Sequence, residues 1–127
     1  MRTFAVLLTG MMLSIVYPAA ARDRVESTID LQRYCRSSES SDSFRVCIAF
    51  MREAVLKLDY LGEATGRSYY CAPGGHDFRR YAEIFNDWAA NNQKRRGEPA
   101  VLGVVAALAN AFPCDERRTN GQQAESP

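Results

Sequence analysis

Four cysteines place the strongest constraint on how this 127-residue chain can fold. An even number of cysteines in a small exported domain is typical of disulfide bonds, because a small core supplies little stability alone. The competing interpretation is a zinc site, but the intervals of 11, 23 and 42 residues contain no close Cys-x-x-Cys pair. We therefore expect two disulfide bonds, with neither a metal nor a cofactor, in a chain whose cysteines are Cys35, Cys47, Cys71 and Cys114.

The N-terminus has the three parts of a secretory signal peptide. Arg2 supplies the positive charge, residues 4–17 form the apolar segment, and Ala19-Ala20-Ala21 forms the cleavage site. We expect cleavage after Ala21, which leaves an exported chain of 106 residues (127 − 21), a length that suits one small domain. The alternative is an uncleaved membrane anchor, which the short apolar segment disfavours.

The charge balance excludes two classes of partner. Loss of Arg2 with the leader reduces the basic residues from 16 to 15, which matches the 15 acidic residues. A protein that binds nucleic acid would need a basic face, and a neutral chain gives no reason for attachment to a membrane surface. We therefore expect no nucleic acid partner, and no membrane partner after signal cleavage.

The rest of the chain has helical periodicity and no alternating strand pattern. We expect helices over residues 28–35, 44–61 and 78–90, with Gly62 ending the second. Residues 98–114 are the most apolar segment outside the N-terminus and predict a core helix that is too short to cross a bilayer. Its predicted buried stripe consists of Val101, Val104, Val105, Leu108 and Phe112.

Polar side chains before each helix can accept hydrogen bonds from its free N–H groups. The candidate caps are Ser27, Thr28 or Asp30 for the first helix, Asp42 or Ser43 for the second, and Asp77 for the third. These features predict an all-α fold, a small disulfide-stapled bundle of about four helices in an orthogonal or up-and-down arrangement. The predicted domain spans residues 22–114, and the polar tail 115–127 is expected to be disordered.

Helix order favours one of the three disulfide pairings. In an up-and-down bundle, Cys35 and Cys47 flank a short loop at one end, while Cys71 lies at the opposite end. The fourth helix then returns Cys114 to the end that holds Cys71, and bridged Cα atoms must lie within about 7 Å. We therefore predict Cys35–Cys47 and Cys71–Cys114. A steeply crossed fourth helix is the alternative, because it would bring Cys114 to Cys35 or Cys47.

The sequence offers few groups for catalysis. His76 is the only histidine, and it lies in a Gly-rich loop without metal-ligand spacing. Cysteines in disulfides cannot act as nucleophiles, and no Gly-x-Ser-x-Gly, His-Glu-x-x-His or phosphate-binding loop is present. The basic segment 93–97 is either an anion site or a set of solvated cations near a helix C-terminus, and the second interpretation is favoured. We therefore expect a binding protein without catalytic residues.

Several short motifs resemble the Rap/Tai family of immunity proteins, which protect bacteria from type VI secretion amidase toxins. The matching segments within residues 31–114 are a helix ending in Cys35, Cys47-Ile-Ala-Phe50-Met51, Cys71-Ala-Pro73, an aromatic helix through Tyr81 and Trp88, and Ala107-Leu108-Ala109-Asn110-Ala111-Phe112-Pro113-Cys114. The resemblance implies a periplasmic, helical, disulfide-bonded protein. It also implies binding to a cognate peptidoglycan amidase effector, whose active-site cleft would be blocked, and a homodimer.

The loop 63–77 is the expected contact surface. Tyr69 and Tyr70 suit interface anchors, and His76 lies in the same loop. The alternative is that both tyrosines pack inward and that His76 is solvated. Two other functions stay open: an acid-stress periplasmic chaperone of the Hde type, whose fold the family resembles, and an envelope protein without a toxin partner.

Overall fold

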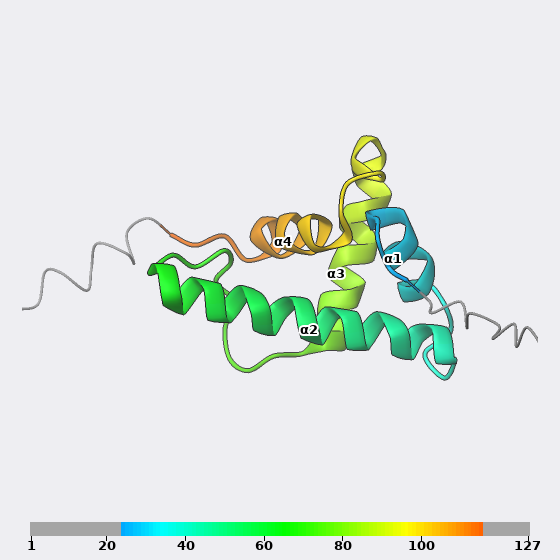
Figure 1. Ribbon diagram of the computed structural model, residues 1–127, viewed down its shortest axis with the longest axis horizontal. Coiled ribbons are helices and arrows are strands. Elements are labelled where there is room, and N and C mark those ends of the chain that lie inside the picture. The colour runs from blue at the N-terminus through cyan, green and yellow to red at the C-terminus, as the bar shows by residue number, and fades with distance from the viewer. Residues whose placement is uncertain (1–23, 116–127) are drawn as a thin grey trace, which may run out of the picture.

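The computed structural model describes residues 24–115, and every regular element in that range is a helix (Figure 1). The elements are α1 (Thr28–Cys35), α2 (Asp42–Thr65), α3 (Phe78–Asn91), a short 3-10 helix η1 (Gln93–Arg95) and α4 (Ala100–Ala111). The predicted all-α bundle is therefore confirmed. The signal peptide predicted at 1–21 and the tail predicted at 115–127 lie outside the described residues, Asp115 excepted.

The helices are arranged orthogonally. In Figure 1, α2 and α4 lie one above the other and run in the same direction along the chain, while α3 crosses them steeply. Helix α1 packs against all three of the other α-helices. The arrangement is therefore not the up-and-down bundle from which the disulfide pairing was predicted.

Side-chain caps fix the first residue of three helices. Ser27 Oγ accepts from the N–H of Asp30 at 3.3 Å, and the Asp30 carboxylate accepts from the N–H of Ser27 at 3.1 Å. These two bonds form a capping box, and the hydrogen bonds from Ser27 lower the pKa of Asp30. Asp77 caps α3 as predicted. The cap of α2 is Ser41, which accepts from the N–H of Phe44, so the choice of Asp42 or Ser43 was wrong.

The predicted end of α2 was also wrong, because two glycines have different roles there. The helix continues through Gly62 to Thr65 and ends at Gly66, whose φ of 68° suits glycine. The chain then turns back over Gly62, where the N–H of Arg67 donates to the Gly62 carbonyl at 3.1 Å. A Cβ on Gly62 would lie 3.0 Å from the carbonyl oxygen of Arg67. Gly62 therefore permits this close return of the chain and does not end the helix.

The buried face of α4 is made mostly of small residues. Its buried residues are Ala100, Gly103, Val104, Ala107 and Leu108. The predicted stripe was right for Val104 and Leu108, whereas Val101 is 38% exposed. The physical reason is close packing: a Cβ on Gly103 would lie 2.6 Å from Thr28 Oγ1 of α1 and 3.1 Å from the Phe85 ring of α3. A bulky stripe could not approach α1 and α3 so closely.

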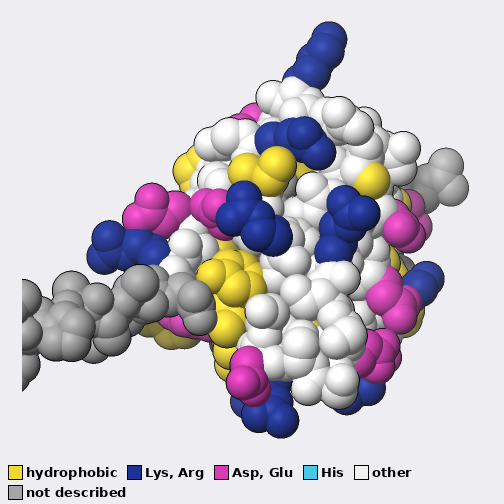
Figure 2. Space-filling view, turned by 90° about the vertical axis from the view of Figure 1, so that its right-hand side faces the viewer, with side chains coloured by type: hydrophobic (Ala, Val, Ile, Leu, Met, Phe, Trp, Pro, Cys, Tyr) yellow, Lys and Arg dark blue, Asp and Glu magenta, His cyan; other side chains and the backbone are white. Residues whose placement is uncertain are grey.

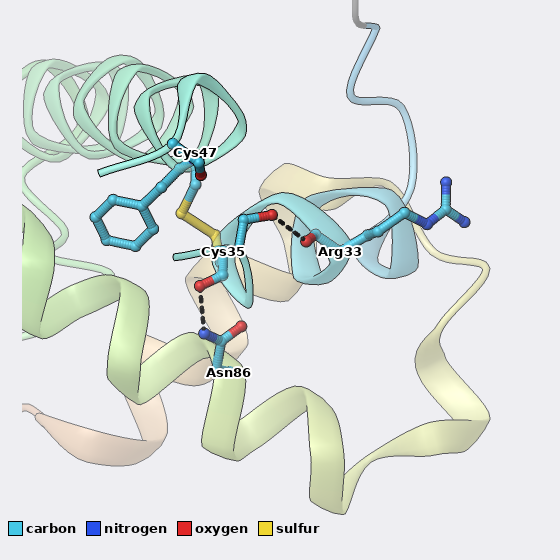
Figure 3. The surroundings of a disulfide bond; sticks show 7 residues. Arg33, Cys35, Cys47 and Asn86 are labelled. Carbon is cyan, nitrogen blue, oxygen red and sulfur yellow. Dashed lines mark hydrogen bonds between the residues drawn. A yellow bond between two sulfur atoms is a disulfide. The ribbon is translucent and has the colours of Figure 1, made fainter. Parts of the chain in front are cut away.

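Two disulfide bonds join the ends of the elements as predicted. Cys35–Cys47 and Cys71–Cys114 both have Cα–Cα distances of 5.0 Å. Figure 3 shows that α3 is hydrogen-bonded beside the first disulfide, where the Asn86 amide donates to the Cys35 carbonyl at 2.9 Å. The second pairing results because α4 runs in the same direction as α2 and so ends near the loop that follows α2. The predicted disulfide pairing is therefore confirmed, although the up-and-down arrangement of helices from which it was predicted is wrong.

We expect Gly103→Ala to destabilise the domain by about 1 to 2 kcal/mol. The added methyl would overlap Thr28 and Phe85, and this overpacking outweighs the better helix propensity of alanine. Urea unfolding of the oxidised protein measures the difference. Gly97→Ala is the matched control, because a Cβ there meets nothing within 4 Å. Equal stability of both variants would contradict the close-packing role of Gly103.

Candidate partner-binding surface

The segment between α2 and α3, residues 66–77, is held to the core at its centre. Cys71 is bonded to Cys114, and the N–H of Cys71 donates to the Phe112 carbonyl at 2.8 Å. These bonds fasten the segment to the C-terminal end of α4. Its central residues therefore have a fixed position although they form no helix or strand.

The two predicted contact tyrosines differ in exposure. Tyr70 is 9% exposed and packs edge-on against Tyr81 of α3, with ring centroids 6.1 Å apart. Its hydroxyl donates to Asp59 Oδ1 of α2 at 3.1 Å. Tyr69 is 42% exposed. Burial of Tyr70 removes its ring from any partner's reach, so only Tyr69 of this pair presents an aromatic surface.

His76 is partly exposed and is fixed by its neighbours, so it is not a simply solvated residue. Its Nε2 lies 2.7 Å from Asp59 Oδ2, and its Nδ1 lies 3.3 Å from the Tyr81 hydroxyl. The imidazole also stacks on Phe78, with ring centroids 5.7 Å apart. These contacts hold the C-terminal part of the segment between α2 and the first turn of α3.

Asp59 of α2 is the residue that joins these groups, and the sequence analysis did not identify it. The only signal for it was its position four residues after Val55, which is buried on the core-facing side of α2. Burial and the nearby Asp59 charge raise the pKa of both Tyr70 and Tyr81 above the usual value. Tyr70 therefore stays protonated and acts as a hydrogen-bond donor to Asp59.

Together these residues line a hollow of about 290 Å³ beside the Cys71 disulfide. The polar side chains that line it are hydrogen-bonded to one another, since the Asp59 carboxylate contacts both the Tyr70 hydroxyl and His76 Nε2. Within residues 24–115, no group of three or more histidine, cysteine or acidic side chains could hold a metal ion. These hydrogen bonds hold the segment against α2 and the first turn of α3.

A second exposed set consists of apolar side chains on α2 and α4. Its members are Leu56, Tyr60, Leu61, Val101 and Leu102. No helix in the described part of the chain is long and apolar enough to cross a membrane. The homodimer stays a prediction. Together with Tyr69, these are the large apolar side chains that are exposed within residues 24–115.

Comparison with known families gives a match over the whole disulfide-bonded domain. The model for Rap1a immunity proteins matches residues 27–114, more than half of the chain. The chain belongs to the Rap1a immunity protein family. The matched range begins at the cap of α1, Ser27, and ends at the last disulfide cysteine, Cys114. Membership supports an immunity role, which implies binding to a cognate toxin. No curated protein and no solved structure matches the chain.

We expect Tyr70→Ala to destabilise this family member by about 3 kcal/mol, because it removes a buried aromatic ring. Tyr69→Ala should change the free energy of unfolding by less than about 0.5 kcal/mol, since the side chain is exposed. Thermal unfolding followed by circular dichroism compares the two variants. Similar losses of thermal stability in both variants would contradict the difference in burial between Tyr69 and Tyr70.

Proposed function

We propose that the protein is a periplasmic immunity protein that binds a type VI secretion peptidoglycan amidase toxin and blocks its active-site cleft. The observation that carries this proposal is the match to Rap1a immunity proteins across residues 27–114. The two disulfides support export, because such bonds persist in oxidising compartments. The protein acts by binding and has no hydrolase activity of its own.

The contact surface in this proposal is the segment 66–77, with Tyr69 as its aromatic anchor. An exposed tyrosine supplies a large contact area with few rotatable bonds. The segment is fixed at Cys71 by the disulfide and at His76 by Asp59, so it loses little conformational entropy on binding. A preorganised loop keeps more of its contact energy as affinity.

We expect export with cleavage after Ala21, which would give a mature chain that begins at Arg22. The motivation is the leader-like N-terminus together with the disulfides. Intact-mass spectrometry of the periplasmic fraction, without reductant, measures both the cleavage and the two bonds. A periplasmic form that still carries Met1 would contradict the cleavage site.

We expect Tyr69→Ala to weaken binding to the cognate amidase by about tenfold to a hundredfold, the range for an interface anchor. The thermal midpoint should not change, because the side chain is exposed. Tyr60→Ala on α2 is the matched control, with a tyrosine that is 71% exposed and lies outside the segment. Isothermal titration calorimetry with purified amidase compares the three proteins.

Two results would contradict the proposed function. One is full amidase activity in the presence of excess oxidised immunity protein. The other is suppression of aggregation of unrelated proteins at pH 2 to 3 without any amidase binding, which would favour the acid-stress chaperone. A binding defect in Tyr60→Ala but not in Tyr69→Ala would keep the function and move the contact surface to the outer face of α2.

A further inference from the structure

A basic hollow on α1 lies apart from the segment 66–77. Three residues of α1 and its C-cap, Arg36, line it at helical spacing, and one arginine from the segment after η1 faces them. The hollow has a volume of about 440 Å³, and its lining residues are Ile29, Gln32, Arg33, Arg36 and Arg96. Figure 2 faces the side of the molecule on which α1 lies, and Lys and Arg side chains gather across its upper half.

The backbone holds Arg96 against α1. The N–H of Ile29 donates to the Arg96 carbonyl at 3.0 Å, and the N–H of Thr28 donates to the Glu98 carbonyl at 2.8 Å. These bonds satisfy free N–H groups in the first turn of α1. These backbone hydrogen bonds therefore fix the position of the Arg96 main chain relative to α1, which carries Arg33 and has Arg36 as its C-cap.

The charges in the hollow are poorly balanced by the protein. Within the described residues, Arg36 and Arg96 form no ion pair, and Arg33 reaches only Asp30, at 3.9 Å. The neighbouring Arg95 is different, because it binds Glu98 at 2.8 Å. The helix dipole places about half a negative charge at the C-terminus of α1, which offsets only a small part of the positive charge of the three arginines.

Two polar groups in the hollow are shielded from solvent. Arg96 Nε is buried and has no hydrogen-bond acceptor within the described residues. Gln32 is only 5% exposed, and its amide can both donate and accept hydrogen bonds. A buried donor without an acceptor is uncommon in native proteins, and a bound ligand is one way to satisfy it.

We propose that Arg33, Arg36 and Arg96 form a binding site for a phosphate group. Guanidinium groups match phosphate oxygens in geometry. Three guanidinium groups in one hollow favour a phosphate group over a single carboxylate, because a phosphate offers more acceptor oxygens to several donors. A phosphate monoester carries about −1.5 to −2 at pH 7, whereas a phosphodiester such as a phosphatidylglycerol headgroup carries one negative charge. Its source is either a free phosphate compound or a phospholipid headgroup. The site is independent of the proposed amidase contact.

The test uses the mature, oxidised protein and inorganic phosphate at constant ionic strength. Chemical-shift titration should show saturable binding, with the largest changes at residues of α1 and at Arg96. Arg36→Gln and Arg96→Gln should each weaken binding by about tenfold, the effect of losing one charge-assisted hydrogen bond. Arg67→Gln is the matched control, since it removes an exposed arginine that lies outside the hollow.

Vesicles distinguish the two sources. Co-sedimentation with phosphatidylglycerol vesicles but not with phosphatidylcholine vesicles, lost in Arg36→Gln, would identify a lipid phosphate. Phosphate binding without vesicle binding would identify a free compound. If Arg96→Gln fails to fold, the exposed Arg36 carries the test alone.

Three results would overturn the proposal. The first is no saturable phosphate or vesicle binding. The second is equal binding by the wild-type protein, Arg36→Gln and Arg67→Gln. The third is a loss of amidase affinity in Arg36→Gln without phosphate binding, which would make the hollow a protein contact.

Discussion

The close approach of α4 to α1 and α3 is the constraint on which the rest of the structure depends. Gly103 has no side chain, so it leaves room for Thr28 of α1 and the Phe85 ring of α3 at the point where the three helices meet. This position of α4 determines where its C-terminus lies, and therefore where Cys114 can bond to Cys71. The segment that follows α2 is bonded to the C-terminal end of α4, so its position depends on packing at Gly103, near the N-terminal end of that helix.

Most of the fold could be predicted from periodicity and caps, and the exceptions have physical reasons. The helix 28–35 and the cap Asp77 were predicted correctly, because local hydrogen bonds determine them. The end of α2 was not, since either Gly62 or Gly66 could end a helix and only the returning chain decides between them. The buried face of α4 was predicted correctly at Val104 and Leu108, but helical spacing of large apolar residues could not identify the buried Ala100, Gly103 and Ala107.

The candidate site was predictable only in outline. The loop could be identified from its glycines, but neighbouring tyrosines in a segment without periodicity give no sign of which ring points inward. Asp59 could not be recognised either, because its partners Tyr70 and His76 lie 11 and 17 residues away along the chain. Contacts of that range depend on the turn at Gly66 and on the disulfide at Cys71, which are tertiary features.

The disulfides also divide the chain into parts with different resistance to proteolysis. A single cut between Cys35 and Cys47, or between Cys71 and Cys114, leaves both fragments covalently joined. Those two closed loops contain the connections 36–41, 72–77 and 92–99. Among the connections between helices, only residues 66–70 lie outside both loops. The stretch that carries Tyr69 is therefore the one connection where a single protease cut would separate the protein into two unlinked pieces.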